Sequence, residues 1–393
     1  MFADFIQKCP QHEALSYEDI KDRFFFQAYG LSNFYETQLA LLGNITDTIV
    51  PSFDLMQEKW RAVHGFRGLT RFATVLEQLV ALQPEVLYIE DIFFFSEIEL
   101  DQIRSKVKSL RLVYGFLGSA YAESTLRRMR KYDFIVTCTN ELADEFRAAG
   151  IETHMLLHAF EPSVLGRLGH SHHDERTDIS FFGALTSGEQ FHNGRNEILQ
   201  YLVTHGVDIK LFSEVTQGTD HLRIPIQAVA KAVGAISRLG YFSALEDLSI
   251  VRKVRGWVPR ESMVVDRRVQ ERIRRPLFGL DMYKALSTST VTFNSHIKRS
   301  RLARNMRLFE ATGVGTCLLT DWRENMADMF EDGKEVVNYR SAEDCLAKVQ
   351  WLVQNPDEAG RIGAAGQRKC LEEHTYKNRA SRLDQIIGDR LSS

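Results

Sequence analysis

Apolar residues in the first half of the chain occur in short runs separated by amphipathic stretches. The runs of strand length lie at 46–50, 86–90, 112–115, 134–138 and 154–157. Helical spacing between them predicts helices near 53–63, 69–82, 98–108, 122–131 and 140–149. Residues 17–42 also place apolar positions on one helical face, and Gly43 ends that pattern. Strands and helices that alternate at this spacing predict βαβ units and a parallel sheet.

A second series of the same kind follows a polar break. Residues 161–177 contain a proline, two glycines and several histidines, a composition typical of a linker or long loop. Beyond this break, strands are predicted at 179–182, 208–212, 290–294, 316–319 and 336–337. Helices are predicted near 195–205, 225–238, 242–250, 279–287, 301–312, 341–354, 357–371 and 376–388. The pattern therefore predicts an α/β protein with two sheet domains, whose ligands bind beyond the carboxyl ends of the strands.

Composition agrees with this organisation and excludes some functions. The chain has 393 residues, more than one hydrophobic core usually serves, so two domains are expected. The formal net charge of −3 argues against binding nucleic acid. There is no apolar run of about 18 residues, and the first residues lack the features of a secretory signal. Five scattered cysteines suit a reducing, cytoplasmic environment.

The segment 305–321 carries the first candidate site. An amphipathic helix with Glu310 ends at Gly313 and Gly315, and an apolar strand follows at once. Glycines allow backbone N–H groups to approach a phosphate, and a carboxylate beside them can accept hydrogen bonds from ribose hydroxyls. The spacing of the two glycines is by itself explained better if Gly313 caps the helix and Gly315 forms a tight connection to the strand.

A second candidate is the junction after the apolar run 179–182. Gly183 follows that run directly, and Arg195 comes near the start of the next predicted helix. The glycine would let the backbone approach a diphosphate, and the arginine would add charge near a helix N-terminus, a natural anion site. The alternative is an ordinary surface loop with a solvated arginine.

A third candidate is the end of the apolar run 290–294. Asn294 and His296 lie there, followed by the basic residues Lys298, Arg299, Arg301, Arg304 and Arg307. Cations at this position would stabilise a departing diphosphate. Arg307 is the first choice because it precedes Glu310 by about one helical turn. Arg301 and Arg304 are expected to be solvated or paired with acidic neighbours. His296 would donate a hydrogen bond to the sugar or phosphate, or serve only as a polar loop residue.

These motifs together resemble a known family. The segment 307–311, with Gly313 and Gly315, resembles the donor-binding segment of group 1 glycosyltransferases of GT-B fold, closest to the branch of CgeB-like proteins. The resemblance continues through 279–283, 291–296 and 330–337, and through His374, Thr375, Tyr376 and Arg379. It is strong over 277–385, fair over 176–212 and weak over 15–165.

The resemblance implies a fold and an activity. The fold would be two Rossmann-like doubly wound domains facing a central cleft, with an acceptor domain at 1–165, a donor domain at 176–375 and a bracing helix at 376–393. The activity would be transfer of a sugar from a nucleotide-diphosphate sugar to a saccharide, glycolipid or protein acceptor, without metal or cofactor. The implied donor-binding residues are Gly183, Arg195, Asn294, Asn305, Arg307, Glu310, Gly313, Gly315 and Thr316.

The sequence departs from the family pattern in two places. Many retaining relatives carry a second glutamate eight residues before the one at position 310, where this chain has Leu302. The family usually opens with an apolar strand, which residues 1–6 do not provide. The resemblance therefore does not imply that this protein retains the anomeric configuration of the donor sugar. A nucleotide-sugar epimerase or hydrolase, or a non-catalytic protein that binds sugar nucleotides or glycans, stays open as an alternative.

A catalytic base for an inverting reaction is expected in the first half of the chain. Glu90 and Asp91 lie at the carboxyl end of the apolar run 86–90 and are the first candidates, with His296 as a further catalytic candidate. Asp91 would otherwise cap the following helix. His64 and His158 are weaker alternatives.

Two other segments contain residue types that can bind a metal ion or a lipid surface. Histidines 170, 172 and 173 lie in the polar linker without cysteine partners, so we expect no metal site there. Residues 252–275 contain nine lysines or arginines against three acidic residues, with Trp257 among them. This segment would either contact anionic lipid, placing the protein at the inner face of a membrane, or form a solvated helix with internal ion pairs.

Overall fold

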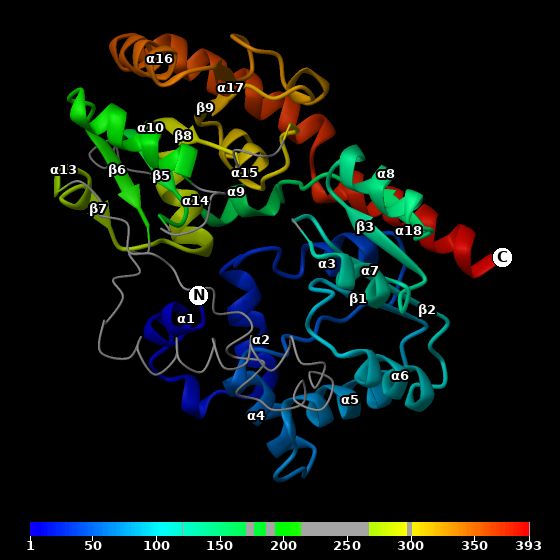
Figure 1. Cartoon of the computed structure of the whole chain (residues 1–393). Helices are drawn as coiled ribbons and strands as arrows, with labels where there is room; N and C mark the ends of the chain where they lie inside the picture. The colour runs from blue at the N-terminus through cyan, green and yellow to red at the C-terminus, as the bar shows by residue number, and fades with distance from the viewer. Residues whose placement is uncertain (120, 170–176, 186–192, 214–266, 297–300, 393) are drawn as a thin grey trace, which may run out of the picture.

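The computed structural model describes residues 1–119, 121–169, 177–185, 193–213, 267–296 and 301–392. Two parallel sheets, one in each half of the chain, form separate layers with helices packed around them (Figure 1). The helices predicted at 225–238 and 242–250, the histidines at 170, 172 and 173, and residues 252–266 of the basic segment lie outside the described residues. No helix of the described part is long and apolar enough to cross a bilayer.

The N-terminal sheet has four parallel strands in chain order: β1 (Val86–Ile89), β2 (Leu112–Phe116), β3 (Phe134–Thr137) and β4 (Thr153–Met155). The strand predicted at 46–50 is wrong, because residues 44–50 form no regular element. Their polar side chains bond locally instead: Thr46 donates to the carbonyl of Glu36, and Asp47 pairs with Lys21. The chain opens with a helix, α1 (Phe2–Lys8), and no strand precedes β1.

The two faces of this sheet are covered by different parts of the chain. On one face lie α5 (Arg71–Leu82), α6 (Glu97–Lys106), α7 (Glu123–Met129) and α8 (Asn140–Ala148). On the other face lie α3 (Phe34–Leu41) and α18 (Tyr376–Ser392), the last helix of the chain. Strands in chain order place their connecting helices on one side, so this sheet is not doubly wound. In Figure 1 the red α18 runs back beside β3 and α3.

The remaining N-terminal helices form a small aromatic cluster. α1, α2 (Tyr17–Phe26) and α4 (Asp54–Val63) pack through Phe5, Phe24 and Phe53, next to the short 3-10 helix η1 (His12–Ala14). The helical pattern predicted over 17–42 is divided into α2 and α3. Ala28, Gly30 and Ser32 adopt positive φ between them, which ends one helix before the next begins.

The C-terminal sheet has six parallel strands in the order β10-β9-β8-β5-β6-β7. Their bounds are β5 (Thr177–Phe182), β6 (Ile209–Phe212), β7 (Ile273–Arg274), β8 (Ser289–Asn294), β9 (Cys317–Asp321) and β10 (Val337–Tyr339). The chain proceeds outward from β5 in one direction and then from β8 in the other. The order therefore reverses between β5 and β8, and in such sheets ligands bind beyond the carboxyl ends of the strands at this point.

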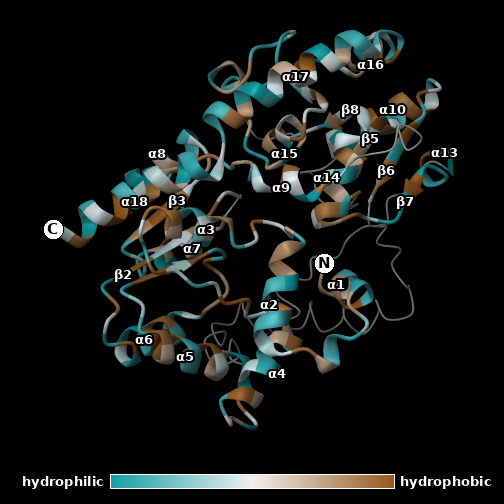
Figure 2. Ribbon diagram, turned by 180° about the vertical axis from the view of Figure 1, so that it is seen from behind, coloured by the Kyte–Doolittle hydropathy of each residue, from teal (hydrophilic) through white to brown (hydrophobic). Residues whose placement is uncertain are grey.

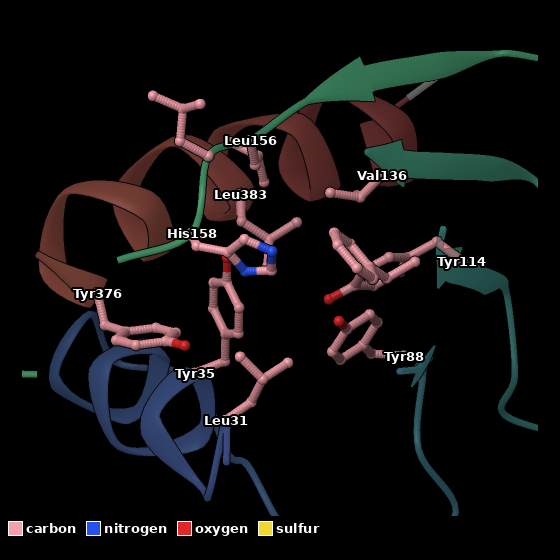
Figure 3. A pocket seen from close by; sticks show the side chains of 11 residues that line it. Leu31, Tyr35, Tyr88, Tyr114, Val136, Leu156, His158, Tyr376 and Leu383 are labelled. Atoms are coloured by element: carbon pink, nitrogen blue, oxygen red, sulfur yellow. The ribbon is translucent and has the colours of Figure 1, made fainter. Parts of the chain in front are cut away.

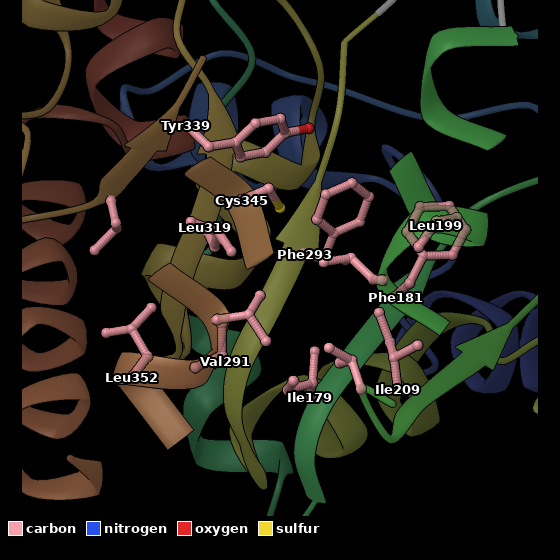
Figure 4. Packing of buried hydrophobic residues seen from close by; sticks show 14 of the residues in the cluster. Ile179, Phe181, Leu199, Ile209, Val291, Phe293, Leu319, Tyr339, Cys345 and Leu352 are labelled. Atoms are coloured by element: carbon pink, nitrogen blue, oxygen red, sulfur yellow. The ribbon is translucent and has the colours of Figure 1, made fainter. Parts of the chain in front are cut away.

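Helices cover both faces of this sheet. Figure 4 shows one face, where residues of β5, β8 and β9 pack against Leu199 of α10 (Asn193–Thr204) and Leu352 of α16 (Ala342–Gln354). The other face is covered by α14 (Gly279–Ser287), α15 (Arg307–Gly313) and part of α17 (Pro356–Glu373). Short elements complete this half: α9 (Ser163–Arg167), α13 (Arg267–Gln270) and η4 (Met326–Asp328). In Figure 2 the surface helices carry both hydrophilic and hydrophobic residues, as expected for helices with one buried face.

The helix predicted at 301–312 begins later than expected, at Arg307. Side-chain hydrogen bonds hold the preceding residues in an irregular loop. Asn325 accepts from the backbone N–H of Ala303 at 2.6 Å and donates to its carbonyl at 3.1 Å. This loop lies at the carboxyl edge of the sheet.

The two halves are joined where the chain crosses between them twice. Phe160 pairs with the segment around Thr375: its N–H donates to the carbonyl of His374 at 2.9 Å, and its carbonyl accepts from Tyr376 at 3.0 Å. The two crossings are thus hydrogen-bonded side by side. α18 begins directly after this junction.

Candidate functional site

Polar side chains meet at the carboxyl ends of β5, β8 and β9. Arg195, in the first turn of α10, connects the loops that follow the first two of these strands. Its Nη1 donates to the carbonyl of Ala184 at 3.2 Å, and its Nη2 to the carbonyl of Ser295 at 3.1 Å. The structure therefore places Arg195 at the reversal in strand order, beside Gly183.

Arg195 is held in a largely apolar setting. Its guanidinium lies 5.6 Å from the centroid of the Phe181 ring, and burial lowers the pKa of the group. A β-carbon at Gly183 would come 2.9 Å from the Phe181 ring and 3.5 Å from Arg195 Nη1. Glycine at position 183 therefore leaves room for the Arg195 side chain, independently of any contact with a ligand.

His296 follows β8 and is fixed by a residue that ends β9. The Nδ1 of His296 lies 2.7 Å from Oδ1 of Asp321, which also accepts from the His296 backbone N–H at 2.9 Å. The second oxygen of Asp321 accepts from Arg323 Nε at 2.9 Å. Burial alone would raise the pKa of Asp321, but the hydrogen bonds from His296 and the charge of Arg323 outweigh it and lower this pKa to about 2.

Arg307 and Glu310 form an ion pair within α15. Arg307 Nη1 lies 2.9 Å from Glu310 Oε2; Glu310 is buried and Arg307 is partly buried. The guanidinium also lies 5.4 Å from the centroid of the Phe182 ring, which belongs to β5. The helix thus brings a carboxylate and a cation to the face of the sheet next to Gly183.

Asn294 and Asn305 hold each other. Asn305 Nδ2 donates to Asn294 Oδ1 at 2.8 Å, and Asn294 Nδ2 donates to Thr320 Oγ1 at 2.9 Å. The hydroxyl of Tyr339 donates to the Asn294 carbonyl at 3.1 Å. Both side-chain amides are thus hydrogen-bonded within the protein. They connect the loop before α15 to the end of β8.

The structure corrects the prediction for Gly313, Gly315 and Thr316. These residues precede β9, whereas the polar cluster lies beyond the carboxyl ends of the strands, at the opposite edge of the sheet. Gly313 packs against the ring of Phe160, and Thr316 Oγ1 donates to the carbonyl of Leu286. The parallel direction of β8 and β9 makes α15 run back across the sheet, so Arg307 begins the helix near the carboxyl ends of the strands and Gly313 ends it toward the opposite edge.

Three buried nitrogen atoms of the cluster have no hydrogen-bond partner in the described part of the chain. They are Arg195 Nε, His296 Nε2 and Arg307 Nε. Buried polar atoms are nearly always satisfied by protein or water, so such a concentration calls for an explanation. Arg307 is paired with Glu310, and Arg323 with Asp321. Arg195 donates to carbonyls, so its charge is in excess and favours an anion at this edge.

Glu90 and Asp91 follow β1 in the N-terminal sheet. Asp91 Oδ1 accepts from the backbone N–H of Phe93 at 2.9 Å, so this carboxylate stabilises its own turn. Glu90 is exposed as a residue, yet surrounding protein atoms desolvate its carboxyl group. This desolvation and the charge of Asp91 raise the pKa of Glu90. No described contact joins either carboxylate to the C-terminal cluster.

Another part of the N-terminal sheet does approach the C-terminal half. Cys138, at the carboxyl end of β3, has a pKa raised to about 11 by burial, and the charge of Arg304 opposes that rise. Arg304 belongs to the loop between β8 and α15, so the carboxyl end of β3 faces this loop. Arg301 pairs with Glu324 through two hydrogen bonds of 3.0 and 3.1 Å, as the prediction of an acidic partner required.

A cavity lies on the N-terminal sheet under α3 and α18. Figure 3 shows Tyr35, Tyr88, Tyr114 and Tyr376 around it, together with His158. Its volume of about 20 Å³ has room for roughly one water and not for a sugar. Burial raises the pKa of Tyr35 to about 12 and lowers that of His158 to about 4. His64, the other alternative base, stacks on Trp60 at 4.1 Å, away from this region.

Sequence analysis missed Asp321 and Arg323. The available signal was weak: a polar residue directly after an apolar strand, at the position where carboxyl-end loops carry ligand groups. Nothing in the sequence connects Asp321 to His296, which lies 25 residues earlier.

Comparisons with known proteins agree with this architecture. Residues 236–385 match the family model described as glycosyl transferase-like. No curated protein matches the sequence. HepE of Anabaena in complex with UDP-glucose is similar in structure, with a TM-score of 0.51 and 10% sequence identity, over 84% of this chain and 88% of HepE. A glycosyltransferase of Rickettsia africae has a TM-score of 0.54 and 8% identity, over 91% of this chain and 93% of that one.

The fold shared with these structures is GT-B, as predicted, although the N-terminal sheet is not doubly wound. The segment 236–385 adds the sequence match to glycosyl transferase-like proteins, and it includes β8, α15 and β9 of the candidate site. The comparisons thus show a GT-B fold for the chain and a glycosyl transferase-like sequence over residues 236–385.

Proposed function

We propose that the cluster at the carboxyl ends of β5, β8 and β9 binds a nucleotide-diphosphate sugar as glycosyl donor. The observation that carries the proposal is the set of three buried nitrogens on Arg195, His296 and Arg307 that have no partner among the described residues. Phosphate oxygens are acceptors only, so a diphosphate can satisfy the two arginine donors directly and Nε2 of His296 when that atom is protonated.

Each side chain has a role set by its position. Arg195 and His296 face the diphosphate from the loops at the strand reversal, and Gly183 keeps the backbone open beside them. Glu310 accepts from the ribose hydroxyls, with Arg307 keeping it ionised. As the bond to the sugar breaks, negative charge grows on the diphosphate, and fixed cations stabilise that state more than the bound donor. These groups hold the diphosphate without a metal ion.

The acceptor is bound by the N-terminal half and is a saccharide, a glycolipid or a protein side chain. Glu90 is the preferred base, because its raised pKa brings it closer to the operating pH of a general base. The UDP-glucose complex of HepE supports a uridine donor as the first compound to test.

Thermal shift measurements with UDP, GDP and dTDP test the donor site. A ligand that binds only the folded protein raises its Tm, by an amount that grows with concentration over Kd. We expect one nucleoside diphosphate to raise Tm and the matching monophosphate to raise it less. If none of the three has an effect, the proposed donor site is refuted.

Product analysis with a radiolabelled donor then separates a transferase from its alternatives. Leu302 at the position of the first family glutamate is the observation that keeps a non-catalytic binding protein in consideration. Transfer to an acceptor supports the main proposal. Epimerised donor without acceptor identifies an epimerase, and tight binding without turnover identifies a binding protein.

A further inference from the structure

The arrangement of His296, Asp321 and Arg323 has a role that goes beyond holding the loop. We propose that Asp321 is a positioning residue which directs proton uptake to Nε2 of His296 when a diphosphate binds. The protonated imidazole then donates that N–H to a phosphate oxygen. This inference rests on the donor site proposed above and concerns how that site acquires its charge.

The hydrogen bonds around Asp321 determine which imidazole nitrogen carries the first proton. Oδ1 of Asp321 accepts from the backbone N–H of His296 at 2.9 Å and contacts Nδ1 at 2.7 Å. Oδ2 accepts from Arg323 Nε at 2.9 Å and from Arg323 Nη2. A carboxylate with these partners stays ionised and only accepts, so Nδ1 must bear the hydrogen.

Nε2 is then the nitrogen whose state can change. The His296 side chain is 1% exposed, and Nε2 has no partner among the residues that the structure describes. In a neutral imidazole with its hydrogen on Nδ1, Nε2 carries a lone pair. That lone pair repels a phosphate oxygen, whereas a protonated Nε2 attracts it. A proton from solvent therefore converts an unfavourable contact into a charge-assisted hydrogen bond.

The charges around His296 make this uptake depend on the ligand. Asp321, at the end of β9, contacts His296 and is paired with Arg323. Arg195 of α10 donates to the carbonyl of the preceding residue, Ser295, and its charge interacts with that of Arg307, which is paired with Glu310 in α15. The hydroxyl of Tyr339, on β10, lies nearby and donates to Asn294. Two of these three arginines are paired with carboxylates, so the described residues of the site carry about one excess positive charge. A bound diphosphate reverses that sign and favours a second cation.

Calorimetry on the full chain measures the proton directly. Binding of UDP, GDP or dTDP is recorded at pH 7.5 in two buffers with different ionisation enthalpies, and the difference gives the protons taken up. We expect uptake by the wild type, and an affinity that rises as pH is lowered from 8 to 6, by at most about tenfold per pH unit for one proton.

Two variants separate positioning from simple folding. His296→Gln keeps a neutral N–H donor and should bind the diphosphate without proton uptake. Asp321→Asn should weaken binding about tenfold at pH 7.5 and move the uptake to lower pH, because the imidazolium loses its anionic partner. Should Asp321→Asn fail to fold, the wild type and His296→Gln still decide whether His296 takes up the proton, and Asp321→Glu, which keeps the carboxylate but changes its position, then tests the positioning role through the same proton uptake.

The outcomes distinguish this inference from the donor site itself. Binding by the wild type without proton uptake, or uptake that persists in His296→Gln, overturns the role of His296 and leaves the donor site standing. Unchanged uptake in Asp321→Asn overturns the positioning role. Failure of the wild type to bind any of the three nucleotides refutes the donor site, and the inference with it.

Discussion

The ring of Phe160 lies directly against the backbone of Gly313, so closely that a β-carbon at position 313 would come 2.2 Å from the ring's Cγ. Phe160 belongs to one of the two crossings between the halves, and Gly313 ends α15. The glycine that resembled part of a phosphate-binding turn thus makes room for a ring at the domain junction. This relationship gives the first prediction.

Gly313→Ala should destabilise the protein without changing its affinity for the donor nucleotide. A fully buried ring and helix cannot move apart freely, and overpacking of this kind costs about 1–3 kcal/mol or more. Urea unfolding and nucleotide calorimetry on the same variant check both parts. Gly360→Ala is the matched control, because a β-carbon there meets no atom within 4 Å. Weakened nucleotide binding by a stable Gly313→Ala protein would restore the phosphate role.

Glu310→Gln should weaken binding of the nucleotide about tenfold and reduce the free energy of unfolding by about 3 kcal/mol. The amide accepts more weakly from ribose hydroxyls, and Arg307 loses its buried anionic partner. Glu331→Gln is the matched control: Glu331 pairs with Lys334 at the same spacing, but on the surface, where such a pair contributes at most about 1 kcal/mol. Equal affinities of the wild type and Glu310→Gln would remove Glu310 from the donor site.

Arg195→Lys should reduce nucleotide affinity about tenfold while leaving the protein folded. A lysine keeps the charge but cannot bridge the carbonyls of Ala184 and Ser295 at once, so the two loops lose their common partner. Arg301→Lys changes an exposed arginine paired with Glu324 and should bind as the wild type does. Calorimetry with the nucleotide identified by thermal shift compares them. Identical losses in both variants would indicate a general effect of charge geometry and contradict a specific role for Arg195.

Stability should fall as pH is lowered from 6.5 toward 4, in part through His374. Burial is the main reason that its pKa is lowered from 6.5 to about 4, and the charge of Arg379 acts in the same direction. Arg379 Nη2 lies 2.9 Å from Nδ1, and Nε2 lies 3.1 Å from the carbonyl of Met329. The unfolded chain binds this proton first, so acid favours unfolding, by about 2 kcal/mol between pH 7 and pH 5.

His374→Asn should lose that part of the pH dependence. Urea unfolding of both proteins at pH 7 and pH 5 gives the two differences to compare. The variant is expected to be less stable than the wild type at pH 7, because it gives up contacts with Phe309 and Phe330, yet less sensitive to acid. Equal sensitivity in both proteins would show that other groups produce the effect.

Much of the local structure was predictable because its causes are local. Apolar runs bounded by polar residues predicted β1 to β4 in the first half and five of the six strands of the second sheet, apart from small shifts at their ends. The two-residue strand β7 was not predicted. Arg307 and Glu310 are one turn apart on any helix, so their pairing followed from spacing. The strand expected at 46–50 failed, since a β-branched run forms a strand only where a neighbouring strand accepts its backbone.

The sequence by itself determined the alternation of strands and helices, the division into two sheets and the segment that resembles glycosyltransferases. These depend on periodicity and on motifs read within a few residues. Only the tertiary structure decided that Asp321 holds His296, that Gly313 accommodates Phe160, and that α18 covers the N-terminal sheet. Each of these contacts joins residues far apart in the chain. The strand order and the direction of each chain crossing decide which distant residues come into contact. Neither property can be predicted from a local sequence pattern.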